Sequence, residues 1–222
     1  MDKLSGAGTQ PEFLHVDAHC IVVRKPAGLL CVPGRGADKQ DCLAARVQVL
    51  HADALVVHRL DMATSGLWLM ARGPEAQRRL SRAFAEREVG KRYCAVVAGR
   101  LAAPDSADGW GLIDLPLAAD WPNRPRRIID AERGKPSQTR WRVLGEPAGG
   151  QTTRLELEPI TGRSHQLRVH LLALGHPILG DALYAPPEVA AAAPRLLLHA
   201  SALRFAHPSS GAPLALADPP PF

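Results

Sequence analysis

Short apolar segments that end at proline or glycine are the feature that most constrains the fold of this chain. Their length and composition are those of strands rather than of helices. Strands are expected at residues 21–26, 28–36, 54–57, 66–71, 91–99, 154–160 and 196–205, with a last one around 213–216. Because strands outnumber helices and hairpin-like spacings separate several of them, the sequence predicts an α+β fold on a mixed, mainly antiparallel sheet.

Three segments have helical spacing and would flank this sheet. Asp41 is predicted to be the N-cap of a short helix that runs to residue 50. Residues 74–88 place Pro74 in the first turn, apolar side chains on one side and arginines on much of the rest. A turn and then a helix are expected over 161–175, with Gly175 ending the helix. The pattern favours a single domain over residues 13–222, behind a loose polar leader at 1–12.

The bulk composition favours a polyanionic partner without establishing one. The 222 residues carry a formal net charge of +5, and only five of the 27 basic residues are lysine. Arginine suits phosphate because its planar guanidinium donates two parallel hydrogen bonds. A genome rich in G and C would raise the arginine content as well, so both interpretations stay open.

Hydrophobicity and cysteine usage indicate the compartment. Neither the N-terminus nor any internal segment has the apolar run of a secretory signal or a membrane span. The four cysteines form no C-x-x-C pair, so free buried thiols are expected rather than a zinc site. These observations predict a cytoplasmic protein.

The segment HRLDMATSG, residues 58–66, places an acid on a loop between two predicted strands. Loops held by a rigid frame often carry catalytic side chains, so Asp61 is a candidate. The alternative is that its carboxylate only accepts backbone hydrogen bonds from Thr64 or Ser65 in a turn. By the same argument, His58 could be a packed imidazole and Arg59 a solvated charge.

Other familiar catalytic motifs are missing from the sequence. There is no phosphate-binding P-loop, no H-E-x-x-H zinc helix and no G-x-S-x-G nucleophile turn. His165 and His170 are five residues apart, which does not place both on one face of a helix. No metal site is predicted.

Five segments decide between these interpretations of Asp61. In chain order they are KPAGLLCVPG, HRLDMATSG, GKRYCAVVAG, ITGRSHQLRVHLLALGHPILGDALY and RLLLHASALRFAHP. Together they resemble the RluA-type pseudouridine synthases over nearly the whole chain. The segments DWPNRP and GKPSQT resemble those of a dual-specificity member of that family. The resemblance implies the pseudouridine synthase fold around a central catalytic cleft, with no S4-type RNA-binding domain in front of it.

The resemblance also implies the reaction and its residues. The family isomerises uridine in RNA to pseudouridine without a redox change or energy input, so no cofactor is expected. Asp61 matches the catalytic aspartate, Tyr93 the tyrosine that stacks on uracil, and Arg163 the arginine that pairs with the aspartate. An ionised carboxylate in a closed pocket needs such a partner, because burial disfavours the charged form. Attack on the sugar and elimination through a glycal both stay open.

Further family positions would bind the base and the RNA. Leu198 is expected to pack against the base, whereas His199 is expected to be structural. Arg59 is expected to enter the RNA in place of the nucleotide that is flipped out. The other candidate RNA contacts are His58, Trp121, the loop arginines Arg124, Arg126 and Arg127, and the helix arginines Arg78, Arg79 and Arg82.

The implied partners are stem–loops of tRNA and of 23S rRNA, with uridine 32 of the anticodon loop and uridine 746 of the rRNA as targets. A monomer without a protein partner is expected. Two alternatives are a non-catalytic RNA-binding module on the same fold and a carboxylate-based glycoside hydrolase. The second generally needs two nearby acids, and no second acid accompanies Asp61 in HRLDMATSG.

Overall fold

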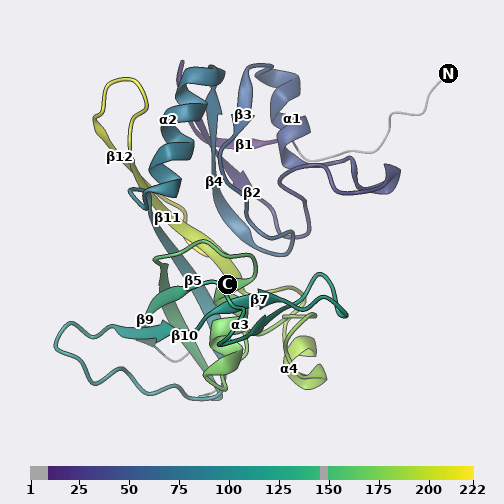
Figure 1. Ribbon diagram of the computed structural model, residues 1–222, viewed down its shortest axis with the longest axis vertical. Helices are drawn as coiled ribbons and strands as arrows, with labels where there is room; N and C mark the ends of the chain where they lie inside the picture. The colour runs from purple at the N-terminus through teal and green to yellow at the C-terminus, as the bar shows by residue number, and fades with distance from the viewer. Residues whose placement is uncertain (1–9, 146–149) are drawn as a thin grey trace.

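One ten-stranded sheet runs through the whole molecule in the computed structural model, which describes residues 10–145 and 150–222 (Figure 1). Its strands are β1 (Glu12–Val16), β2 (Cys20–Lys25), β3 (Ala54–Val56), β4 (Ser65–Arg72), β5 (Gly90–Ala98), β6 (Gly111–Asp114), β9 (Gln138–Gly145), β10 (Thr152–Pro159), β11 (Leu198–Ala206) and β12 (Pro213–Ala217). Strands β7 (Leu117–Ala119) and β8 (Arg127–Ile129) form a separate pair. The helices are α1 (Leu43–Leu50), α2 (Gly73–Ala85), α3 (Gln166–Ala173) and α4 (Pro187–Ala191), with a 3₁₀ turn at Ala37–Lys39.

The sheet is mixed, and its central strands join two halves. The main order is β1-β2-β4-β11-β5-β10-β9-β6, with β3 paired to β4 and β12 paired to β11. Strands β4 and β11 are parallel, and the other pairs in the described chain are antiparallel. The α+β class and the mainly antiparallel sheet predicted from the sequence are confirmed.

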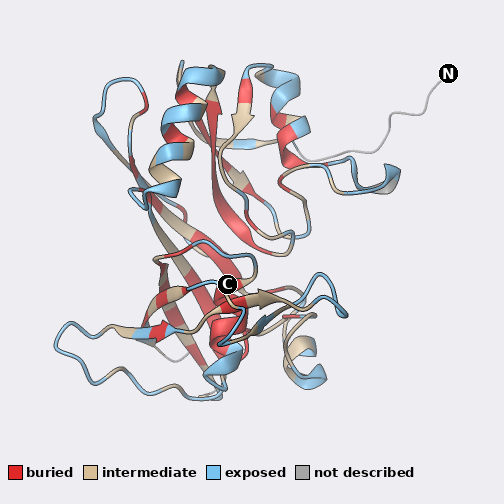
Figure 2. Ribbon diagram, in the orientation of Figure 1, coloured by how far each residue is buried: buried red, intermediate tan, exposed pale blue. Residues whose placement is uncertain are grey.

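Strand β4 is buried on both faces, which explains its unbroken apolar sequence. Trp68 and Met70 point into a core cluster that includes residues of α1. Leu67 and Leu69 point the other way, into a cluster with Leu80 of α2. The N-terminal half of the sheet is therefore covered by one helix on each face, and Figure 2 shows β4 buried along its length.

The C-terminal half is built around α3. Leu167 and Leu171 of this helix pack in one cluster with Leu155 and Leu157 of β10. Tyr93 of β5 packs against both this cluster and the cluster beneath α1. The two halves thus meet at β5 and β11, and the loops between them face a common opening.

Most of the predicted elements are present, with differences at their ends. Residues 28–36 do not form the expected strand, and their one ladder contact is an isolated bridge from Leu30 to Cys42. The N-cap of α1 is Cys42, whose sulfur accepts the Ala45 N–H at 3.4 Å. Asp41, the predicted cap, instead forms an ion pair with Arg46 at 2.6 Å. A cap one residue later leaves the Asp41 carboxylate free for this pair.

Several short elements were missed in the proline- and glycine-rich middle of the chain. Strands β6, β7 and β8 lie inside residues 102–135, which had no predicted strand. Strand β1 begins at Glu12, inside the predicted leader, and residues 1–9 of that leader lie outside the described residues. Every helix in the described part of the chain falls short of the length and hydrophobicity that a membrane span requires.

Lys25, at the end of β2, ties two loops together from inside the protein. Its side chain is fully buried, and Nζ donates to the carbonyls of Pro26 (2.8 Å), Leu29 (2.7 Å) and Met62 (2.8 Å). Burial lowers the pKa of Lys25 to about 8, so at pH 7 the ammonium keeps all three protons for these bonds. The carbonyl of Met62 belongs to the HRLDMATSG segment, which Lys25 therefore anchors.

Replacing Lys25 should destabilise the protein far more than replacing an exposed lysine. Lys25→Met leaves three carbonyls without the ammonium, and we expect a loss of about 3 kcal/mol in the free energy of unfolding. The matched control is Lys39→Met at an exposed position, where a change within about 0.5 kcal/mol is expected. Urea unfolding followed by circular dichroism measures both, and equal losses would contradict the anchoring role.

Candidate active site

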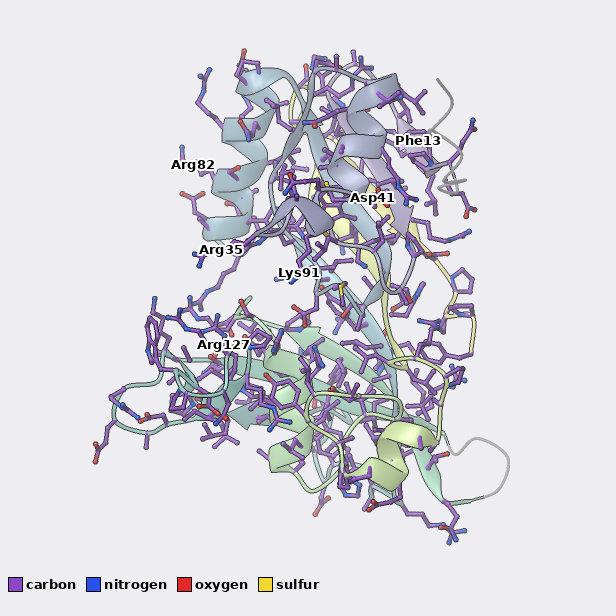
Figure 3. The ribbon with its side chains drawn as sticks, turned by 90° about the vertical axis from the view of Figure 1, so that its right-hand side faces the viewer. Phe13, Arg35, Asp41, Arg82, Lys91 and Arg127 are labelled. Carbon is purple, nitrogen blue, oxygen red and sulfur yellow. The ribbon has the colours of Figure 1, made fainter. Side chains whose placement is uncertain are left out.

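A cleft of about 790 Å³ opens between the two halves of the molecule. Its walls are the loop at 58–64, the start of β5, the turn at 159–165 and the first turn of α3. Figure 3 places Arg35 and Arg82 on the N-terminal half, Arg127 on the other half, and Lys91 between them. The segments that carry the sequence motifs therefore converge on one opening.

The charges in this cleft are strongly unequal. Within the described part of the chain, Asp61 is the only acid in its lining. The basic residues that line it are Arg59, Arg87, Lys91, Arg127, Arg163 and Arg168. A cleft with one sign of charge attracts oppositely charged ligands, so this one is suited to a polyanion.

Asp61 faces the cleft, and in the described chain its carboxylate accepts no backbone hydrogen bond from the turn that follows it. The Thr64 N–H bonds to the main-chain carbonyl of Asp61 at 3.1 Å, so the turn is held by the backbone. The side chain is 25% exposed, with Oδ2 3.7 Å from Nη1 of Arg168 and Oδ1 3.9 Å from Nε2 of His165. The alternative in which Asp61 serves only as a turn cap therefore does not describe this loop.

The predicted pairing of Arg163 with Asp61 is wrong. Arg163 is exposed on the turn before α3, and its Nε donates to the carbonyl of Pro136 at 3.4 Å. Arg168, in α3 itself, is the arginine that approaches Asp61. The segment TGRSHQLR contains both, and only the second lies on a buried part of the helix. The sequence did hold a signal for Arg168, which stands between Leu167 and Val169. An arginine among apolar residues indicates a buried charge that needs a partner.

Arg168 is held between two carboxylates. Its guanidinium makes a bidentate contact with Asp181, at 2.8 Å from Nε to Oδ2 and 2.5 Å from Nη2 to Oδ1. The side chains of Arg168 and Asp181 are only 4% and 1% exposed. Because this fork fixes the guanidinium plane, the remaining Nη1 is directed at Asp61.

Tyr93 and Leu198 form apolar walls of the same cleft. Both line it, and Leu198 is buried at the start of β11. Burial raises the pKa of Tyr93, and the nearby charge of Asp61 adds to the effect, so the phenol stays protonated. The neighbouring His199 is buried and bonds to Ser65 Oγ (2.9 Å) and the Asp218 carbonyl (3.1 Å), the structural position expected for it.

His58 packs inside its loop. Nε2 accepts the Leu69 N–H at 3.1 Å, and the ring stacks on Phe84 with centroids 4.4 Å apart. Burial lowers the pKa of His58 to about 3, so the ring is neutral. These contacts fit the packed imidazole weighed as an alternative for His58, although the ring also lines the cleft.

The predicted RNA-contacting arginines differ in their availability. Arg59 is exposed and has no hydrogen-bond or ion-pair partner among the described residues. Arg127 lines the cleft, and its buried Nε has no hydrogen-bond partner there either. The guanidinium carbon of Arg124 lies 3.3 Å from the ring centroid of Trp121, which is 68% exposed. Arg126 is exposed and lies outside the cleft lining.

The helix arginines lie outside the cleft lining. Arg79 pairs with Glu75 at 2.7 Å within α2, and Arg82 pairs with Glu86, the residue directly after α2, at 2.8 Å. Arg87, in the turn after α2, and Lys91, the second residue of β5, line the cleft and were missed. Burial lowers the pKa of Lys91, and the charge of Arg87 adds to this. The predicted helix 74–88 included Arg87, whereas α2 ends at Ala85 and Arg87 lies beyond it with a φ of 64°.

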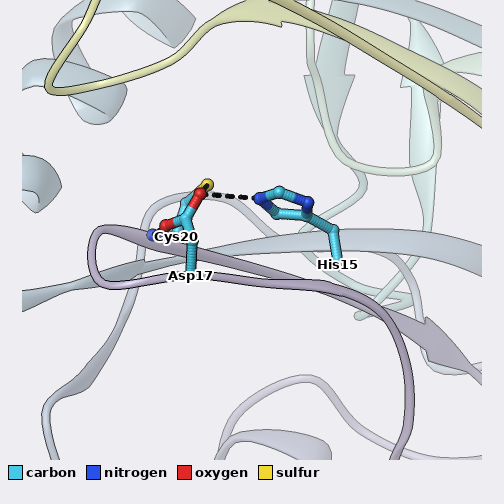
Figure 4. A group of neighbouring side chains, drawn as sticks. All are labelled: His15, Asp17 and Cys20. Atoms are coloured by element: carbon cyan, nitrogen blue, oxygen red, sulfur yellow. Dashed lines mark hydrogen bonds and ion pairs between the residues drawn. The ribbon is translucent and has the colours of Figure 1, made fainter.

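Three residues of the types that bind metal ions lie together at the β1–β2 turn. They are His15, Asp17 and Cys20 (Figure 4). The Asp17 carboxylate is already occupied. One oxygen accepts the N–H groups of His19 and Cys20, and the other bonds to the rings of His15 (2.7 Å) and His207 (3.1 Å). Burial raises the pKa of Cys20 to about 12, which holds it as a thiol. Hydrogen bonding accounts for this group.

Comparisons with known proteins agree with a cleft suited to a polyanion. A family model described as RNA pseudouridylate synthase matches residues 19–173. The dual-specificity RNA pseudouridine synthase RluA of Escherichia coli strain K12 is 52% identical over 210 residues, 95% of this chain and 93% of that protein. RluA of Pasteurella multocida is 49% identical over 211 residues, 95% of this chain and 94% of that protein.

A solved structure extends the likeness to the fold. Human RNA pseudouridylate synthase domain containing 1 aligns with a TM-score of 0.76 at 29% identity, covering 100% of this chain and 87% of that one. Human RNA pseudouridylate synthase domain containing 4 gives a TM-score of 0.72 at 26% identity, covering 95% and 88%. The chain therefore belongs to the RNA pseudouridylate synthase family and is an isomerase that converts uridine to pseudouridine in RNA.

Proposed function

We propose that Asp61 is the catalytic carboxylate of this enzyme and that its substrates are stem–loops of tRNA and 23S rRNA. The observation that carries the role of Asp61 is its place as the only acid lining a basic cleft within the described chain, opposite Arg168. The choice of substrates rests on the similarity to enzymes named dual-specificity RNA pseudouridine synthases.

The surroundings of Asp61 suit a carboxylate that reacts with the sugar. Arg168 keeps a positive charge beside Oδ2, which favours the ionised form that both sugar attack and elimination require. Tyr93 and Leu198 offer a phenol ring and an apolar wall to a flat base. The base stays in the cleft between its two attachments, because isomerisation rejoins the same uracil through carbon.

A glycoside hydrolase does not fit this cleft. Such enzymes generally use two carboxylates, one as acid and one as base or nucleophile. Asp181, the other acid that contacts Arg168, is buried, and both of its oxygens accept hydrogen bonds from that arginine. Asp61 therefore works without a second reacting acid from the described residues.

Access to Asp61 requires a nucleotide that has left its helix or loop stack. Flipping it out costs on the order of a few kcal/mol, least where the base is already in a loop. Arg59 is exposed near Asp61 and has no hydrogen-bond or ion-pair partner among the described residues. We therefore propose that it fills the space in the RNA that the flipped nucleotide leaves. Arg127 and Lys91 would hold the phosphates at the cleft, and the Trp121–Arg124 pair would offer a stacking surface beyond it.

The proposed active unit is a single chain. Each group described around Asp61, from Lys25 to Leu198, comes from the same polypeptide. The proposed compartment is the cytoplasm, because bacteria make and mature tRNA and rRNA in the cytoplasm.

Asp61→Asn tests the catalytic role. The amide keeps the shape but removes the charge, so pseudouridine formation should fall by about 1,000-fold. Binding of an anticodon stem–loop should stay within about twofold, because phosphate contacts supply most of the affinity. The matched control is Asp105→Asn on an exposed loop. Parental rates of pseudouridine formation in Asp61→Asn would remove Asp61 from the mechanism.

A pair of lysine substitutions tests which arginine serves Asp61. Arg168→Lys keeps the charge but loses the bidentate fork, and a misplaced partner should lower the turnover rate by about 100-fold. Arg163→Lys should stay within about threefold, because in the described part of the chain its guanidinium is exposed and hydrogen-bonds to a backbone carbonyl rather than to Asp61. Circular dichroism confirms folding of both variants. The reverse order of losses would restore Arg163 as the partner.

Arg59→Ala tests base replacement. On a folded stem–loop, kcat/KM should fall by about 30-fold, because nothing then fills the gap that the flipped base leaves. On a short unstructured RNA the loss should be only a few-fold, since no stack is opened. Arg78→Ala, an exposed arginine of α2 outside the cleft lining, is the control. Equal losses on the two RNAs would contradict the role.

A further inference from the structure

His165 approaches Asp61 from a backbone conformation that residues other than glycine rarely adopt. Its φ is 58° and its ψ 13°, directly before the first residue of α3. Arg87 is the only other non-glycine residue with a positive φ in the described chain. Such conformations persist where the surroundings enforce them, and they concentrate at functional sites.

The side chain of Gln166 holds this turn in place. Its Oε1 accepts the Arg163 N–H at 3.0 Å and the Thr161 hydroxyl at 2.7 Å. Its Nε2 donates to the carbonyl of Gln138 at 2.9 Å and to Thr139 Oγ1 at 3.0 Å. These bonds hold the backbone at Arg163 and Gln166, the two positions between which His165 turns.

Tyr184 determines which nitrogen of His165 carries the proton. The Arg127 N–H donates to the phenol oxygen of Tyr184 at 2.8 Å, and this oxygen lies 2.6 Å from Nδ1 of His165. Because the oxygen already accepts the backbone proton, the arrangement favours donation of its own proton to Nδ1. A neutral imidazole then carries its proton on Nε2, the nitrogen that faces Oδ1 of Asp61 at 3.9 Å.

We propose that His165, oriented by Tyr184, is a positioning residue that directs an Nε2–H donor at Oδ1 of Asp61. The inference rests on the proposed catalytic role of Asp61. Arg168 Nη1 faces Oδ2 at 3.7 Å, so each oxygen of the carboxylate has one nitrogen opposite it. At 3.9 and 3.7 Å both contacts are longer than hydrogen bonds, and we expect both to shorten when a nucleotide expels water from the cleft.

The Tyr184 contact matters because His165 is neutral. The groups that face the ring are Asp61, Tyr184, Arg168, Arg127 and Asp181. Burial lowers the pKa of His165, partly opposed by the charge of Asp61. A neutral ring has one proton for two nitrogens, so the tautomer decides whether Nε2 can donate to Asp61. An imidazolium donates from both nitrogens, so protonation alone would not remove this contact.

Three substitutions at His165 separate positioning from a structural role. His165→Asn tolerates the left-handed backbone and can still accept the Tyr184 proton, but it cannot reach Asp61. His165→Gln places an amide N–H near the position of Nε2, and His165→Ala removes both contacts. We expect single-turnover rates about 100-fold lower for Asn and Ala, and within about tenfold of the parent for Gln.

Binding and folding supply the controls. The dissociation constant for an anticodon stem–loop should stay within about twofold in all three variants, because His165 acts through Asp61 and not on phosphate. His176→Asn is the matched control: its Nδ1 bonds to the Ala98 carbonyl at 2.8 Å, and it does not line the cleft. A parental rate in His165→Asn, or a loss confined to RNA affinity, would overturn the positioning role.

Nitrogen NMR tests the relay without any measurement of activity. Long-range proton–nitrogen spectra of the parental protein at pH 7.5 should show His165 with its proton on Nε2, and Tyr184→Phe should yield a mixture of tautomers and a slower turnover. A proton on Nδ1 in the parental protein would overturn the relay. If the tautomer is as expected but Asp61→Asn stays active, the proposed role of Asp61 fails. If Asp61→Asn is inactive but His165→Asn is fully active, the positioning role of His165 alone is rejected.

Discussion

The buried ion pair between Arg168 and Asp181 is the interaction on which the site depends. Taking a guanidinium out of water costs several kcal/mol unless a well-placed carboxylate compensates it. Asp181 does so with two short hydrogen bonds, and the N–H groups of Leu183 and Tyr184 hold Asp181 in turn. The spare nitrogen of Arg168 then meets Asp61, which belongs to the other half of the molecule. One guanidinium therefore links α3, the loop after it and the HRLDMATSG segment.

The sheet supplies the frame that lets these parts meet. Strands β4 and β11 are parallel and pair His199 with Ser65 and Ala200 with Gly66. Gly66 has a φ of 109°, and a Cβ there would stand 2.3 Å from the Ala200 carbonyl oxygen, so the glycine of the TSG segment is needed for this approach. Because Leu198 begins the same strand, close pairing at Gly66 brings Leu198 and Asp61 to one cleft.

The sequence predicted what periodicity and motif identity can determine. The apolar runs gave β2, β4, β5, β10 and β11, and the motifs brought Asp61, Tyr93 and Leu198 to one cleft. The motifs did not decide between Arg163 and Arg168, because both lie in TGRSHQLR. Residues 166–171 of α3 are all buried, so the place of Arg168 depends on tertiary packing around the helix and not on an amphipathic pattern. The left-handed turn at His165 and the bonds of Gln166 to β9 and to Thr161 hold the start of this helix. Neither contact leaves a periodic trace in the sequence.

The spacing within HRLD acquires a physical meaning from these contacts. His58 fixes the loop against β4 through the Leu69 N–H, and Lys25 fixes it through the Met62 carbonyl. Between these anchors, Arg59 is exposed and Asp61 faces inward. A loop held at both ends limits how far these two residues can move apart, which suits the proposal that Arg59 enters the RNA while Asp61 receives the nucleotide. Preorganisation of this kind places the energetic cost of ordering in the folding of the protein rather than in each turnover.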